Sequence, residues 1–210
     1  MGQSLSQEVE KKPDVLGDVE RRMRNKLECT KAKLYIDALN DECIAIVCAV
    51  AKFDGMLYIE DAKNQDPKGD IESIMGSYLH MEGNKPDDEL IQLVGNVVKA
   101  LLTHKQGTVE GRHTHVVYAN KGFIRFDYFI YLQILDDGKN AALSYYGQVG
   151  LMDVTKAKPQ VLIYELRRAT DDKKLEKAGK ELEKLESDSM KKVGKFLIKL
   201  ATGEDQIGGT

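Results

Sequence analysis

Two short segments near the ends of the chain carry residue types whose spacing suggests chemistry. The first, residues 1–6 (MGQSLS), matches the pattern M-G-x-x-x-[ST] for attachment of a myristoyl chain to Gly2. The residues that follow are polar, so we expect a flexible arm that presents Gly2 to an acyltransferase. An unmodified, disordered terminus is the alternative interpretation. Because one myristoyl chain binds a bilayer only marginally, acylation predicts a second membrane contact.

The second segment, residues 189–202 (SMKKVGKFLIKLAT), has the pattern of a basic amphipathic helix. At about 100° per residue, its apolar residues fall on one side and its lysines on the other. Helices of this type lie on membrane surfaces or bind apolar grooves of protein partners. A helix packed on the protein with its lysines in water is the alternative, and both states can hold at different times. The predicted membrane-binding residues are Lys191, Lys192, Lys195, Phe196 and Lys199.

Two histidines form the best candidate for a metal site, but the set is incomplete. His113 and His115 lie two residues apart at the start of a predicted strand, so their side chains share a face. A zinc site needs at least a third ligand, and no other histidine or cysteine has the right spacing. We therefore interpret them as surface histidines and expect no metal.

Pairs of acidic residues are the remaining candidates for catalysis. They occur where a strand ends, a helix begins or a turn forms, and acidic residues are common there for backbone reasons. The sequence also contains no glycine-rich phosphate loop and no G-x-S-x-G motif. We predict that the protein is not an enzyme and binds no cofactor. The three pairs are Glu60-Asp61, Asp87-Asp88 and Asp136-Asp137.

Composition narrows the class of protein further. The chain has 210 residues, 42% of them hydrophobic, which is enough to bury a core. Its 31 basic and 34 acidic residues give a net charge of −3, which argues against a general nucleic-acid binder. Three cysteines without a C-x-x-C pair favour reduced thiols in the cytoplasm, and Cys48 is expected in the core.

These segments must be positioned by an α+β domain, which we predict over residues 15–170. Residues 1–14 are the expected flexible arm and 204–210 a frayed tail. Residues 171–203 are a helical segment whose phase slips at Ser187-Asp188-Ser189, which predicts either two helices or one helix kinked there. Apolar residues at steps of three and four predict a helix over 15–39. Between about 71 and 105 the spacing again predicts helices. The fold class is α+β, with a single antiparallel sheet covered by helices.

Six strands are predicted for that sheet. The run CIAIVCAVA, then Asp54-Gly55, then MLYIED predicts a hairpin of strands 43–51 and 56–61. Both faces of the first strand are apolar, which favours a central, covered position. The period of two in 123–135 predicts that Ile124, Phe126 and Tyr128 face the core. The other predicted strands are 114–119, 141–149 and 161–166.

The order of these elements resembles that of the roadblock (dynein light chain) and profilin-like α/β proteins. The resemblance covers roughly residues 15–150 and rests on the helix 15–39, the segment CIAIVCAVAKFDGMLYIED, the helices up to His104 and the strands from Thr114. It implies a dimerising adapter without enzymatic activity that scaffolds larger complexes, often at internal membranes.

We therefore expect a cytoplasmic adapter held peripherally on a membrane by myristoylated Gly2 and the basic C-terminal helix. Its partners would be anionic lipids and a protein, with a homo- or heterodimer possible and no nucleic acid. The alternative is a membrane-active protein, such as a cytolysin or a delivered effector, whose amphipathic helices insert into the bilayer.

Overall fold

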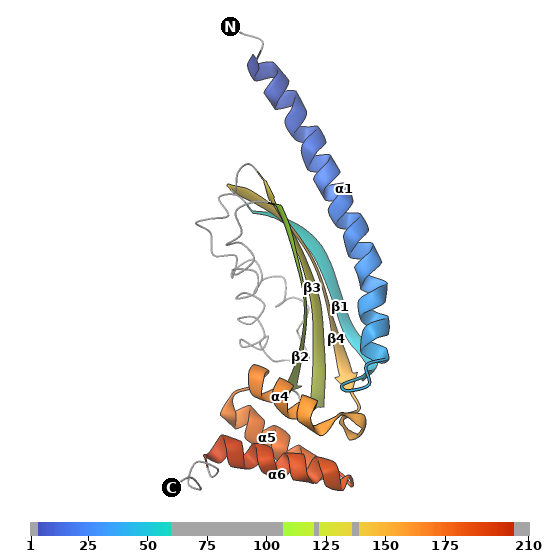
Figure 1. The fold of residues 1–210 in the computed structure, drawn as a ribbon, viewed down its shortest axis with the longest axis vertical. Coiled ribbons are helices and arrows are strands. Elements are labelled where there is room, and N and C mark those ends of the chain that lie inside the picture. Colours follow the sequence, from blue (N-terminus) through green and yellow to red (C-terminus); the bar gives the residue numbers. More distant parts are fainter. Residues whose placement is uncertain (1–3, 60–106, 120–121, 136–138, 204–210) are drawn as a thin grey trace.

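The computed structural model describes residues 4–59, 107–119, 122–135 and 139–203. Four long strands form one antiparallel sheet in the order β1-β4-β3-β2. The α+β class and the single antiparallel sheet are as predicted. Figure 1 shows α1 lying lengthwise along one face of the sheet, with α4, α5 and α6 grouped at one end. The strands are β1 (Ile46–Ile59), β2 (Gly107–Ala119), β3 (Gly122–Leu135) and β4 (Asn140–Met152).

Helix α1 (Ser4–Leu39) buries the stripe that the sequence predicted. Salt bridges such as Arg21–Asp18 and Arg24–Glu20 lie on its solvent side. The helix begins at Ser4, so the prediction of a flexible arm over residues 1–14 is wrong for residues 4–14. Those residues lack an apolar period, but many of them are glutamine, glutamate or lysine, which favour helix intrinsically. The buried residues are Val19, Met23, Leu27, Thr30, Leu34 and Ala38.

The predicted hairpin at Asp54-Gly55 is wrong, because β1 runs straight through it. Asp54 pairs with Tyr146 and Gly55 with Tyr145 in a register with β4 that continues to Ile59. The Tyr145 side chain occupies the space that a Cβ at Gly55 would need, so the ring covers the glycine. The Asp54 carboxylate accepts a hydrogen bond from Lys31 of α1 at 2.7 Å. Tertiary contacts therefore keep Asp54-Gly55 extended, although this dipeptide often forms a turn.

Strand β1 lies at an edge of the four strands, and not at the centre as predicted. Its register with β4 shifts between Ile46 and Cys48 and again between Ala49 and Ala51. The two residues skipped by these bulges, Val47 and Val50, are 60% and 52% exposed. Bulges at an edge strand discourage pairing with further strands. Cys48 is also exposed, which contradicts its predicted place in the core.

Strands β2, β3 and β4 contain the predicted strands 114–119, 123–135 and 141–149. Ile124, Phe126 and Tyr128 are buried as predicted, and so is Ile130. The opposite face of β3 is buried as well, including Arg125 and Asp127. The predicted helices between about 71 and 105, and the predicted end of strand 56–61, lie outside the described residues.

The predicted strand 161–166 is wrong, because it lies inside helix α4 (Pro159–Ala169). Proline in the first turn suits a helix start, since its missing N–H has no partner there anyway. Leu162, Leu166 and Ala169 are buried at helical spacing. A short apolar run such as VLIYEL fits either a strand or a buried helix by periodicity alone.

The C-terminal segment forms two helices, which is one of the two arrangements that the phase slip at Ser187 predicted. Helix α5 (Asp172–Glu183) and helix α6 (Asp188–Thr202) are separated by a short turn. The Ser187 side chain caps α6 by accepting a hydrogen bond from the Met190 N–H. The two helices pack with α4 onto the end of the sheet (Figure 1).

Candidate functional site

The apolar side of α6 is packed against the protein. Met190, Val193 and Leu197 are almost completely buried in a cluster shared with α4, α5 and the nearby strand ends. Gly179 of α5 lies against Gly194 of α6 so closely that a Cβ on either would overlap the other's carbonyl oxygen. In this structure α6 is therefore packed on the protein, as the alternative interpretation of this segment predicted.

The opposite side of α6 carries the predicted membrane-binding residues. Lys192, Lys195 and Lys199 are exposed, and Phe196, which lies among them, is 38% exposed. Within the part of the chain that the structure describes, these three lysines form no ion pair. Lys191 is half-buried and pairs with Asp188 at 4.0 Å, so it is less available to a ligand. The structure thus places three lysines and one aromatic ring on one exposed side of α6, which we call the α6 face (Lys192, Lys195, Phe196, Lys199).

Gly2, the predicted lipidation site, lies outside the described residues. The helix that begins two residues later at Ser4 starts at the far end of the molecule from α6 (Figure 1). The start of α1 and the α6 face are therefore not brought together.

A buried polar network lies between α1 and the sheet, and sequence reasoning missed it. Both carboxylate oxygens of Asp127 lie 2.9 Å from Nε of Arg125, and the guanidinium also reaches Asp41 at 2.7 Å. Thr114 donates to Asp127, and Gln148 donates to the Leu34 carbonyl at 3.1 Å. Two hydrogen bonds from backbone N–H groups and the Arg125 contact lower the pKa of Asp41, although its partial burial opposes this.

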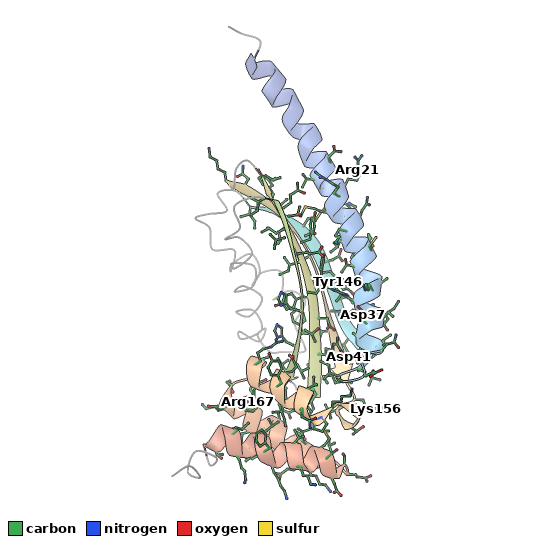
Figure 2. All side chains as sticks on the ribbon, viewed as in Figure 1. Arg21, Asp37, Asp41, Tyr146, Lys156 and Arg167 are labelled. Carbon is green, nitrogen blue, oxygen red and sulfur yellow. The ribbon has the colours of Figure 1, made fainter. Side chains whose placement is uncertain are left out.

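This network ties the end of α1 to the middle of the sheet. It extends to Tyr146, which lies between the sheet and α1 and whose hydroxyl donates to Gln148 (Figure 2). Because all of these polar groups have partners, the network acts as a structural clamp that fixes how α1 sits on the sheet. The signal in the sequence was a pair of opposite charges on one face of an otherwise apolar strand.

A second polar cluster joins α4 to β2 on the other face of the sheet. Nδ1 of His115 lies 2.8 Å from the Arg168 guanidinium, which also contacts Glu165 at 2.8 Å. Since Arg168 can only donate, Nδ1 of His115 accepts, and a neutral ring then carries its proton on Nε2. That nitrogen lies 3.4 Å from the Tyr128 hydroxyl. Burial and then the charge of Arg168 lower the pKa of His115 to about 3.

The environment of this cluster suits a structural role better than acid–base catalysis. A histidine with a pKa of about 3 stays neutral near pH 7 and is a poor base there. Burial also raises the pKa of the Tyr128 hydroxyl and of Glu165. The prediction that both histidines lie on the surface is wrong, because His115 is buried and the rings of both histidines stack on Tyr128.

No metal site forms among the described residues. His113 and His115 share a face as predicted, but no three metal-ligating side chains come together in the described ranges. Nδ1 of His115 already contacts the Arg168 guanidinium. To bind a cation through this nitrogen, His115 would have to lose that contact or turn its ring. The carboxylate pairs Glu60-Asp61, Asp87-Asp88 and Asp136-Asp137 lie wholly outside those ranges.

Comparison with known proteins gives no relative: no family model, curated protein or solved structure matches this chain. Among the described helices, none combines the length and the apolar character needed to cross a bilayer. Of the candidate sites, the α6 face is the one whose predicted residues lie within the described ranges and share one exposed side of a helix.

Proposed function

We propose that the protein is a non-enzymatic adapter that rests on a cytoplasmic, anionic membrane surface. An acyl chain on Gly2 and the α6 face would hold it there together. One observation supports the proposal most directly: Lys192, Lys195 and Lys199 are exposed, with no acidic partner among the described residues, on the side of α6 opposite its buried apolar stripe. A helix in this state can meet a membrane without leaving the protein.

The expected energies make two contacts necessary. A single myristoyl chain binds with an association constant on the order of 10⁴ M⁻¹. Each lysine near an anionic surface contributes about 1 kcal/mol, so three contribute roughly 3 kcal/mol. At half that value the lysines still raise affinity about tenfold. The ring of Phe196 would sit at the level of the headgroups, where aromatic side chains are favoured.

This geometry favours surface contact over insertion. A helix that inserts must withdraw Met190, Val193 and Leu197 from the protein core, which costs roughly 5–9 kcal/mol before any lipid contact forms. The second candidate, a cytolysin or delivered effector with inserting helices, therefore faces a barrier that the adapter does not. Its distinguishing property would be damage to the bilayer.

The adapter role also implies a protein partner, which is part of the proposal. The resemblance to roadblock proteins suggests dimerisation, with a second copy of this chain or with a related one. Light scattering of the purified protein at several concentrations would detect a homodimer directly.

A vesicle binding and leakage assay tests the proposal. Protein produced with an N-myristoyltransferase, and checked for acylation by intact mass, is mixed with dye-loaded vesicles that contain phosphatidylserine. The adapter is expected to co-sediment with the vesicles while the dye stays inside. Dye release at protein levels that saturate binding would favour the cytolysin instead, and an acylated protein that stays in the supernatant would refute membrane residence.

A further inference from the structure

The two outer strands of the sheet differ in how they are protected against pairing with another chain. Strand β1 carries two bulges, and bulges at an edge discourage further pairing. Strand β2 pairs with β3 from Gly107 to Ala119 without a register shift. Among the strands that the structure describes, none pairs with the outer side of β2. A regular edge of this kind can accept a further strand.

Helix α4 covers only the second half of this outer side. Residues 115–118 are buried, and the Arg168 guanidinium of α4 donates a hydrogen bond to the Thr114 carbonyl. In the first half of the strand the exposed residues are Gly107, Thr108, Glu110 and Arg112. We call this stretch, residues 107–112, the β2 edge.

The contact with Arg168 also indicates which backbone groups of β2 point outward. The Thr114 carbonyl reaches a helix outside the sheet, so it points away from β3. In an antiparallel ladder, residues that point both backbone groups outward alternate with residues that bond to the neighbouring strand. Because the register has no shift, Thr108, Glu110 and Arg112 share the outward orientation of Thr114. Their N–H and C=O groups need partners from water or from another strand.

The charges on the β2 edge select one register for pairing with a second copy of the chain. In an antiparallel pair centred on Gly111, Glu110 of each copy lies opposite Arg112 of the other. Opposite charges directly across two strands are favourable, and like charges are unfavourable. A register centred on Glu110 or on Arg112 would place like charges opposite each other. The register centred on Gly111 is therefore the self-complementary one.

Contacts with α1 extend this complementarity. The Glu110 carboxylate lies 2.7 Å from Lys26, and the Arg112 guanidinium lies 3.0 Å from Asp37. Across the pair, the four side chains form a row of alternating sign. The centre of the row is clear, because Gly111 has no side chain and the central residues of such a pair approach to about 4.5 Å between Cα atoms.

The helices on the sheet leave room for a second copy. Helix α1 packs on residues of β3 and β4, one to two strands inward from the β2 edge. Two copies of α1 would lie about four strand spacings apart, roughly 19 Å, and a helix is about 10–12 Å wide. Pairing would end where Thr108 meets Thr114 of the other copy, since α4 already holds that carbonyl.

From this geometry we infer that the β2 edge pairs with the β2 edge of a second copy, around a twofold axis at Gly111. The pairing joins two four-stranded sheets into one continuous sheet. The inference rests on the proposed function, because it deepens its protein-partner part: the partner is the same chain, and the contact is residues 107–112. The contact is short and polar, so the dimer exchanges with monomer as the concentration changes. It uses no residue of the α6 face.

Sedimentation equilibrium of the full-length chain, made without the acyltransferase, tests the inference over a wide range of concentrations. The mass should rise from monomer to dimer. Glu110→Pro removes an outward N–H that the dimer uses but β3 does not, so it should weaken dimerisation about tenfold or more. Thr108→Pro is the matched control: it also removes an outward N–H, but one outside the two central pairs, and it should dimerise like the parent. Circular dichroism confirms that both variants fold.

A pair of charge variants tests the contact without altering the backbone. Arg112→Glu makes the β2 edge acidic, and Glu110→Arg makes it basic. Each variant alone should stay monomeric, because like charges then face each other. An equal mixture should form a heterodimer, in which every charge on the edge faces its opposite. Two variants that remain monomeric when mixed would contradict the pairing.

The contrary results are distinct from failure of the membrane contact. A parent chain that is monomeric at every concentration would overturn the inference, and vesicle binding would still decide membrane residence. A dimer that Glu110→Pro leaves unchanged would also overturn it, because the contact then lies elsewhere. Equal weakening by Thr108→Pro and Glu110→Pro would refute the register centred on Gly111. A dimer that behaves as expected but binds no vesicles would support the inference and refute the membrane part of the proposed function.

Discussion

The guanidinium of Arg168 on α4 lies 2.8 Å from Nδ1 of His115 on β2. This contact holds the imidazole neutral, because a protonated ring would place a second positive charge beside Arg168. Burial of the ring acts in the same direction and is the larger cause of its lowered pKa. Protonation of His115 should therefore weaken this contact between α4 and the sheet.

Folding stability should therefore fall as the pH drops below about 6.5. The pKa of His115 is about 3 in the folded protein, below the usual 6.5, so the unfolded chain binds the proton more readily. The contribution of neutral His115 to the free energy of unfolding is fully present above pH 6.5. It declines by up to about 1.4 kcal/mol per pH unit towards pH 3. Because of this group, the free energy of unfolding measured in urea should be about 2 kcal/mol lower at pH 5 than at pH 7. His115→Gln should lose most of that dependence, and an unchanged difference would show that His115 is not its source.

Removing Asp127 should be costly, because it leaves the Arg125 guanidinium buried with only part of its partners. We expect Asp127→Ala to lower the free energy of unfolding by about 3–5 kcal/mol. The double change Arg125→Leu with Asp127→Leu should recover part of this loss, since no unpaired charge then remains in that pair. Chemical denaturation of both variants measures the difference. A double variant less stable than Asp127→Ala would argue that the network matters for more than charge balance.

The close crossing of α5 and α6 predicts opposite effects for two glycines. Gly194→Ala should lower the free energy of unfolding by about 1–3 kcal/mol, because the new methyl group meets the Gly179 carbonyl. Gly17→Ala in α1 is the matched control, since no atom lies within 4 Å of the place that its new methyl group would take. It should stabilise by about 0.5–1 kcal/mol through helix propensity. Equal thermal shifts for the two variants would contradict the tight crossing.

Core burial gives a further stability prediction. Ile46→Ala in β1 and Ile130→Ala in β3 should each cost about 2–5 kcal/mol, because both side chains are buried. Ile36→Ala, at a position that is 53% exposed, should change stability by less than about 0.5 kcal/mol. Urea midpoints for the three variants test this ranking, and an unchanged midpoint for Ile130→Ala would be incompatible with the observed strand.

The sequence was most informative where periodicity continued over many residues. The buried stripe of α1, the core face of β3 and the break at Ser187 all follow from such patterns. Short signals were less reliable, because tertiary contacts decided them. Asp54-Gly55 remains extended under Tyr145 and beside Lys31, and VLIYEL became a helix through its packing at the end of the sheet.

The candidate site was predictable only in part. The division of α6 into a lysine side and an apolar side could be predicted, whereas the docking of its apolar side depends on contacts with α4 and α5. The two buried polar clusters join residues far apart in the chain, such as Arg125 with Asp41 and Arg168 with His115. No local pattern connects such pairs, so a single sequence does not reveal them.

The most direct test of the account is co-sedimentation of the acylated protein with phosphatidylserine vesicles, comparing two triple variants of equal charge. One changes Lys192, Lys195 and Lys199 of the α6 face to Gln, and the other changes Lys173, Lys177 and Lys180 of α5. With a membrane contact through α6, the α6 variant should lose about tenfold in affinity at low salt, and this difference should shrink at high salt. The α5 variant should bind nearly as well as the parent. Equal binding by the α6 variant and the parent at both salt concentrations would contradict a membrane contact through α6.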